Sequence, residues 1–208
     1  QLRLAQLYLV SKRWEDASFW LQEGLRTNPE NRWALQQLAE CYERLNRSKE
    51  AIHLMESWMQ KPERTSLALH QTLGMLYLNE LEFESFEKHQ LKGLKQYPNN
   101  SEIYQELATF YQGIQRPREA HKLLLRLLSK QPENENLILQ VVSLEQKIGL
   151  NKQAKQRILE TLEGNVTSEK MWQFWIELQL TQDASKDVSA DLIEMLSQFP
   201  SSEWAGVK

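Results

Sequence analysis

Apolar residues recur along this chain at steps of three and four, the spacing that places them on one face of an α-helix. Between residues 33 and 42, for example, Leu35, Leu38, Ala39 and Tyr42 form one such stripe. Polar turns interrupt the stripes, and prolines stop one helix before the next begins. The pattern predicts about twelve helices, at residues 1–11, 14–27, 32–45, 48–60, 66–79, 83–96, 101–113, 117–130, 135–148, 151–163, 168–181 and 187–198.

The stripes repeat with a period of about 34 residues. Tyr8, Tyr42, Tyr77 and Tyr111 follow one another at steps of 34, 35 and 34, and a large-small pair precedes each tyrosine. A two-helix unit cannot bury its apolar face alone, so this period predicts stacked helix pairs. We expect repeats at about 1–31, 32–65, 67–100 and 101–134, degenerate repeats at 135–167 and 168–200, and a tail or a further helix at 201–208.

The second helix of most repeats carries an alanine at one fixed position, where a methyl group lets two helices approach closely. These residues are Ala17, Ala51, Ala120 and Ala154. The third repeat has Phe86 there, which predicts a splayed or shifted helix pair. The fifth repeat has Glu145 where the others have tyrosine.

The first helices should begin at polar capping residues. Asn31 and Ser101 are the predicted N-caps of the second and fourth repeats.

The first four repeats share Leu-Ala/Gly-x-x-Tyr and a closing proline, at Pro29, Pro62, Pro98 and Pro132, and all but the third have an alanine nine residues after the tyrosine. This pattern resembles the tetratricopeptide repeat (TPR) family. The resemblance implies an all-α, right-handed α-solenoid of about six helix–turn–helix repeats that forms a single superhelical domain over residues 1–208. It also implies a concave groove, lined by the first helices, that binds a protein or peptide segment without catalysis.

Transferred by register, the resemblance assigns fourteen groove residues to the first four first-helices. They are Gln6, Leu9, Trp33, Gln36, Gln37, Glu40, Glu43, Arg44, Gln71, Met75, Leu78, Gln105, Thr109 and Gln112. The same register adds Asn79, Glu102, Gln146, Lys147, Gln173 and Glu177. Glutamine both donates and accepts hydrogen bonds, which suits an extended peptide backbone or sugar hydroxyls. Glutamine is also a good helix former, so plain surface filling is the alternative.

The family members that hold a partner's terminal carboxylate use lysine, asparagine and arginine at a subset of these positions. This chain has Leu2, Gln6, Gln37, Glu102 and Glu106 there. Because like charges repel, that mode of binding is not expected here.

Composition limits the remaining classes of function. The net charge of -3 and pI near 5.9 argue against a globally basic nucleic-acid binder, so no nucleic-acid partner is expected. No apolar run is long enough to span a membrane. The single cysteine, Cys41, excludes an internal disulfide and is predicted to be a small, buried or half-buried apolar residue that fills space. The four histidines lack metal-binding spacing, and no phosphate loop or nucleophile elbow occurs, so we predict no catalytic, cofactor or metal site.

The leading hypothesis is a scaffold or adaptor that holds a protein segment, as a part of a larger protein or assembly. A docking or regulatory TPR domain of a glycosyltransferase, or of a polysaccharide-export or secretion protein, is the alternative. An RNA-processing protein of half-TPR type is a third class, suggested by Trp172, Trp175 and Glu177. Self-association is a further option, and the compartment is open between a bacterial cytoplasm and a bacterial envelope.

Overall fold

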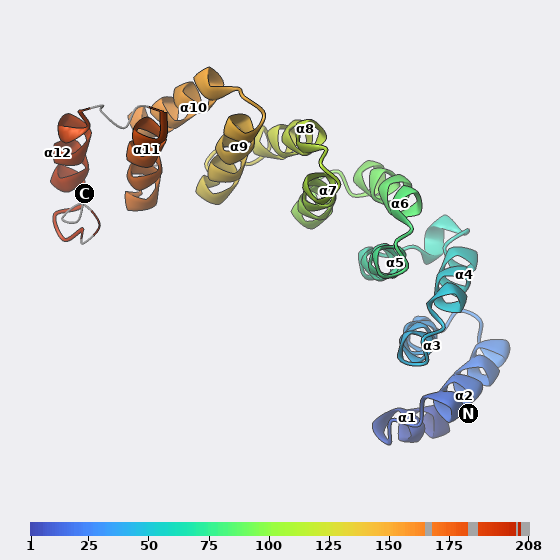
Figure 1. The fold of residues 1–208 in the computed structure, drawn as a ribbon. Helices are drawn as coiled ribbons and strands as arrows, with labels where there is room; N and C mark the ends of the chain where they lie inside the picture. The colour runs from blue at the N-terminus through green and yellow to red at the C-terminus, as the bar shows by residue number, and fades with distance from the viewer. Residues whose placement is uncertain (165–167, 183–186, 203, 205–208) are drawn as a thin grey trace. The chain divides into compact units, whose positions relative to one another are not determined.

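A computed structural model describes residues 1–164, 168–182, 187–202 and 204, and Figure 1 labels its helices. The described residues contain α-helices, one short 3-10 turn (η1) and no strand. The elements are α1 (Leu2–Val10), α2 (Trp14–Thr27), α3 (Arg32–Arg44), α4 (Ser48–Trp58), η1 (Pro62–Arg64), α5 (Leu67–Asn79), α6 (Phe83–Gln96), α7 (Ser101–Gly113), α8 (Pro117–Leu128), α9 (Glu135–Lys147), α10 (Asn151–Glu163), α11 (Glu169–Gln182) and α12 (Ser189–Gln198). The predicted helices are confirmed, and η1 is the element that the pattern missed. Of the predicted segment 201–208, residues 203 and 205–208 lie outside the described residues.

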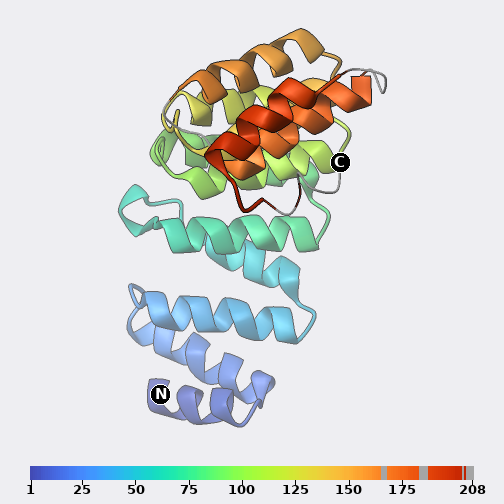
Figure 2. The same cartoon turned by 90° about the vertical axis from the view of Figure 1, so that its left-hand side faces the viewer.

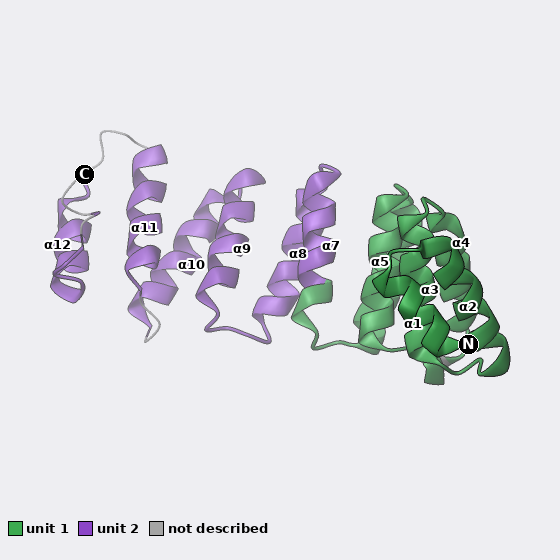
Figure 3. Cartoon of the chain, turned by 90° about the horizontal axis from the view of Figure 1, so that it is seen from below, with its two compact units in different colours: residues 1–103 green, residues 104–208 purple. Residues whose placement is uncertain are grey.

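The chain divides into two compact units, residues 1–103 (unit 1) and 104–208 (unit 2), shown in different colours in Figure 3. In unit 1 each helix from α1 to α6 packs against the next one, and Figure 2 shows these helices in blue to green. In unit 2 the same holds from α8 to α12, and α11 also contacts α9. The single domain over residues 1–208 stays a prediction.

Polar side chains cap the first helices at a repeating position. The side-chain oxygens of Asn31, Ser66, Asn100 and Asn134 accept hydrogen bonds from the backbone N–H three residues later, at 2.9, 3.3, 3.0 and 3.1 Å. These bonds satisfy donors that a helix start leaves open. The expected cap at Ser101 was wrong by one residue, because Ser101 is already helical and Asn100 accepts the bond.

The turns inside the helix pairs share one backbone geometry. Lys12, Asn46, Leu81, Gln115 and Gly149 adopt positive φ angles of 55°, 56°, 59°, 60° and 82°. The residue after each donates its N–H to the carbonyl at the repeat's tyrosine position, for example Arg47 N to Tyr42 O at 2.7 Å. This left-handed cap ends the first helix and turns the chain into the second.

The small residues pack as predicted. Ala17, Ala51, Ala120 and Ala154 are all fully buried. In the third repeat Phe86 is buried instead, and α5 and α6 approach each other less closely than α1 with α2 or α3 with α4. The bulky ring therefore accounts for the splayed pair that the sequence predicted.

Candidate functional site

The fourteen residues assigned to the groove lie on α1, α3, α5 and α7, and none of them is buried. Trp33 keeps 40% of its surface exposed and Met75 keeps 56%. The side chains of Trp33 and Met75, both in unit 1, are therefore open to solvent. Gln71 is partly engaged, since its Nε2 donates to a carboxylate oxygen of Glu102.

The first-helix face of unit 1 contains a hollow of about 540 Å³, which we call the acidic hollow. Its lining residues are Gln36, Gln37, Glu40, Glu43 and Arg44 of α3 with Thr72 of α5. Arg44 lies 3.6 Å from a carboxylate oxygen of Glu40, and Asn79 Nδ2 donates to Glu43 at 3.4 Å. Two carboxylates against one guanidinium leave this hollow with a net negative charge.

The first-helix face of unit 2 contains a second hollow, of about 650 Å³, which we call the lysine hollow. Its lining residues are Gln105 and Gln112 of α7, Asn136, Leu139, Gln140, Ser143, Leu144 and Lys147 of α9, and Lys170 and Phe174 of α11. Lys170 Nζ donates to Asn136 Oδ1 at 3.0 Å. The lining contains two lysines and no carboxylate, so this hollow is positively charged.

Seven of the fourteen predicted residues thus line one of the two hollows, and seven do not. Gln36, Gln37, Glu40, Glu43, Arg44, Gln105 and Gln112 line a hollow. The remaining residues, Gln6, Leu9, Trp33, Gln71, Met75, Leu78 and Thr109, lie on the first helices outside both linings.

The groove assignment included Gln105, Gln112 and Lys147 but missed the rest of the lysine hollow. Leu139, Gln140 and Ser143 occupy in the fifth repeat the positions that Gln36, Gln37 and Glu40 occupy in the second. Applying the whole register of the second repeat to the fifth would have found them. Lys170 and Phe174 follow from the same register one repeat later.

A larger hollow, of about 940 Å³, lies elsewhere in unit 1, against α4, α5 and α6, and includes two stacked histidines. The rings of His70 and His89 are 3.8 Å apart, and His89 Nε2 donates to the carbonyl of His70 at 2.9 Å. Burial lowers the pKa of both rings, and with the neighbouring His70 it lowers the pKa of His89 to about 4. Both rings are therefore neutral at neutral pH.

A glycine makes room for this pair. A Cβ atom on Gly93 would lie 2.2 Å from Nε2 of His70. His70 Nε2 also lies 3.0 Å from Oε1 of the fully buried Gln90. These contacts show that the histidines fill the splayed third repeat as packed, neutral rings.

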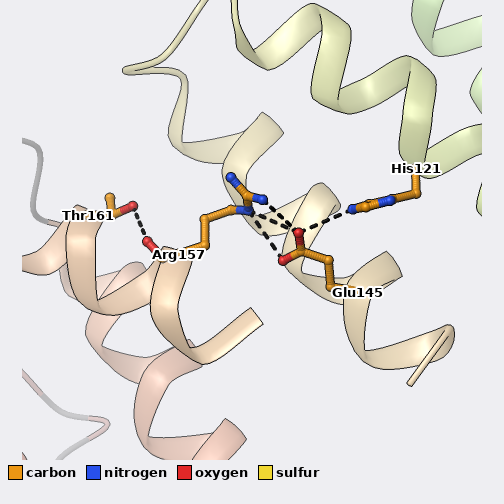
Figure 4. A network of polar contacts seen from close by, with 4 residues as sticks. All are labelled: His121, Glu145, Arg157 and Thr161. Atoms are coloured by element: carbon orange, nitrogen blue, oxygen red, sulfur yellow. Dashed lines mark hydrogen bonds and ion pairs between the residues drawn. The ribbon is translucent and has the colours of Figure 1, made fainter. Parts of the chain in front are cut away.

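A buried ionic network replaces the tyrosine of the fifth repeat (Figure 4). Glu145 is 0% exposed, and Arg157 binds its carboxylate through Nη2 at 2.7 Å and Nε at 3.2 Å. His121 Nε2 lies 3.1 Å from the same carboxylate. The network joins α8, α9 and α10 inside unit 2, so Glu145 has a structural role.

Cys41 is fully buried, as predicted. Burial, together with the nearby Glu40 carboxylate, raises the pKa of its thiol to about 11, so it stays protonated at neutral pH. In the described ranges, no group of three or more histidine, cysteine or acidic side chains could hold a metal ion. Nor does any helix found there have the length and apolar character needed to cross a bilayer.

No family model and no curated protein matches this sequence. Solved structures do match. The MamA protein is 15% identical with a TM-score of 0.56, over 78% of this chain and 88% of MamA. PilF of Pseudomonas aeruginosa is 17% identical with a TM-score of 0.53, over 100% of this chain and 96% of PilF. YrrB, described as a TPR protein with an unusual peptide-binding site, is 13% identical with a TM-score of 0.54, over 90% of this chain and 96% of YrrB. At these identities the likeness concerns the fold.

Proposed function

We propose that this chain, an all-α solenoid with the fold of tetratricopeptide repeat proteins, is a non-catalytic scaffold that holds extended protein segments on its first helices. The observation that carries the proposal is the lining of the lysine hollow. Among the described residues, the side-chain amides of Gln105, Gln112 and Gln140 have no protein hydrogen-bond partner. Each amide can donate to a peptide carbonyl and accept from a peptide N–H.

Apolar and cationic groups lie beside these amides. Phe174 is half-buried in the lining and offers an apolar anchor for a side chain of the bound segment. Lys147 and Lys170 add positive charge, which favours a segment with acidic residues. The acidic hollow of unit 1 has the opposite charge, so it favours a segment with basic residues.

Fluorescence polarisation with two labelled peptides tests this proposal. One peptide alternates glutamate with leucine, the other alternates lysine with leucine, and both are amidated at the C-terminus to exclude capture of a terminal carboxylate. The double variant Gln105→Ala/Gln140→Ala should weaken binding of the acidic peptide about tenfold, because each lost hydrogen bond contributes about 0.5–1.5 kcal/mol. Gln153→Ala, on the exposed surface of α10, is the matched control and should bind as the wild type does.

Reversing the charge of the lysine hollow tests whether that charge selects between the acidic and the basic peptide. Lys147→Glu/Lys170→Glu should weaken the acidic peptide at the lysine hollow and strengthen the basic one. Lys122→Glu/Lys152→Glu changes the net charge equally, at exposed positions of α8 and α10, and should leave both affinities unchanged. Binding that is unaffected by either hollow variant would refute the proposal.

A further inference from the structure

The lysine hollow extends along almost the whole of α9. Its lining includes Asn136, the second residue of that helix, and Lys147, the last one. At a helix rise of about 1.5 Å per residue, these two positions are about 16 Å apart along the axis. An extended segment covers this length with about five residues, since each adds about 3.3 Å. The hollow therefore fits a stretch of about five residues that lies along the helix.

The two lysines of the lining lie toward opposite ends of this hollow. The bond from Lys170 Nζ to Asn136 Oδ1, 3.0 Å long, holds Lys170 beside the first turn of α9. Lys147 ends α9, is exposed, and forms no ion pair with any described residue. A bound segment can thus pair two carboxylates with the hollow, one at each end.

Phe174 lies between the levels of the two lysines. It follows Lys170 on α11 by one helical turn, so both side chains lie on the same face of the helix, about 6 Å apart along its axis. In an extended segment, residues two apart point to the same side and are also separated by about 6.6 Å. An acidic side chain at Lys170 and an apolar one at Phe174 therefore match residues two apart.

The next residue on that side of the segment comes close to Lys147. It lies about 13 Å from the first acidic residue, compared with about 16 Å between the levels of the two lysines. The remaining difference of about 3 Å is within reach of the lysine side chain, which carries its charge on a flexible four-carbon stem.

We infer that the lysine hollow selects a partner segment with the pattern acidic–any–apolar–any–acidic. The two acidic side chains pair with Lys147 and Lys170, and the apolar one packs on the ring of Phe174. The amides of Gln105 and Gln140 remain for the backbone of the segment. The pattern is the same in both chain directions, so it applies to either orientation. This inference rests on the proposed function, because it specifies the segment that the same hollow holds.

Fluorescence polarisation with two labelled peptides of identical composition tests the place of the apolar residue. One contains Glu-Ser-Leu-Ser-Glu and the other Glu-Leu-Ser-Ser-Glu, with the same serine-rich flanks and amidated C-termini. Moving the leucine by one position turns it to the opposite side of an extended segment. The wild-type protein should bind the first peptide about tenfold more tightly, because only there does the leucine bury against Phe174.

Two variants show whether this preference comes from Phe174. Phe174→Ala should bind both peptides equally, because the ring that distinguishes them is gone. Phe199→Ala is the matched control and should keep the preference, since Phe199 is also half-buried and lies outside the lining. Circular dichroism checks that each variant folds, and Phe174→Gln replaces a Phe174→Ala that does not.

A third peptide, Gln-Ser-Leu-Ser-Gln, tests the two acidic positions. It should bind the wild-type protein about fivefold more weakly than Glu-Ser-Leu-Ser-Glu, because two partly exposed ion pairs are lost. Lys147→Gln/Lys170→Gln should remove this difference. Lys122→Gln/Lys152→Gln, at exposed positions of α8 and α10, is the matched control and should keep it.

Equal binding of all three peptides by the wild-type protein would overturn the inference. The proposed function would still stand if Gln105→Ala/Gln140→Ala weakened all three. A leucine preference that persists in the folded Phe174 variant would overturn the inference too, because another part of the surface would then read the pattern. If no peptide binds at all, the proposed function fails together with the inference.

Discussion

Replacing Arg157 by methionine should destabilise unit 2 strongly, because it leaves the Glu145 carboxylate buried without its main partner. Breaking a buried ion pair from one side costs roughly 3–5 kcal/mol. The Arg157 side chain is 27% exposed and His121 still contacts the carboxylate, so water and the imidazole relieve part of this cost. We therefore expect the low end of the range, about 3 kcal/mol.

Removing the other partner should cost less. Glu145→Gln keeps an acceptor oxygen for His121 and leaves Arg157 beside solvent, so we expect about 1 kcal/mol. Arg26→Met is the matched control, because Arg26 pairs with Glu23 while its own side chain is 76% exposed. An exposed pair contributes at most about 1 kcal/mol.

Equilibrium unfolding in urea, followed by circular dichroism, measures the three free energies. Amide hydrogen exchange over α9 and α10 shows whether the loss is located in unit 2, which matters because repeat arrays can unfold in parts. The reasoning is refuted if Arg157→Met destabilises no more than Arg26→Met. It is also refuted if Glu145→Gln is the more damaging change, since the carboxylate would then be the replaceable partner.

Three further predictions concern unit 1 and α7. The free energy of unfolding should be constant above about pH 7 and fall as the pH drops below 6.5, because the histidines take up protons in the unfolded chain but not in the folded pair. The loss should level off near pH 4, the pKa of His89. A pH series of urea unfolding with and without His89→Asn measures it. Leu81→Gly should raise the free energy of unfolding by about 1 kcal/mol, measured by thermal unfolding, because leucine is strained at a φ of 59°. Asn46→Gly should change the free energy of unfolding little, because asparagine tolerates this conformation. Equal effects of the two substitutions would argue against strain at Leu81. Gly93→Ala should destabilise the protein by about 1–3 kcal/mol, because the added Cβ would overlap the imidazole of His70. Gly113→Ala should stabilise it slightly, because a Cβ there meets open space. Thermal unfolding of both variants in parallel measures the difference.

Most of the fold could be predicted from the sequence. Helix periodicity and the repeated tyrosines placed every helix, and Phe86 alone indicated the splayed third pair, because contacts between neighbouring repeats are local along the chain. The sequence predicted where the turns lie but not their left-handed backbone conformation. Leu81 and Gln115 adopt a left-handed conformation that their residue types do not favour, with backbone hydrogen bonds from the next residue to the end of the first helix, so no residue preference indicated it.

The candidate site was predicted in part. Register placed Gln36, Gln105 and Lys147 on exposed first-helix faces. In the degenerate fifth repeat it was applied only to the end of the first helix, and so Gln140 was missed. The ion pair of Glu145 was not predictable, because its partner Arg157 stands on the next helix at a repeat position where the earlier repeats have Trp20, Leu54, His89 and Leu123.

The sequence by itself determined the helices, their pairing and the positions that face outward, since a period of about 34 residues and stripes at steps of three and four encode these features directly. Only the tertiary structure decided how charge is distributed among the outward positions. Lys147 of α9 and Lys170 of α11 line one hollow because packing brings these two helices together, and Thr72 of α5 joins Glu40 of α3 in the other hollow for the same reason. Burial likewise made Glu145 a structural ion and the stacked histidines neutral, since desolvation acts through the surroundings of a side chain and not through its place in the chain.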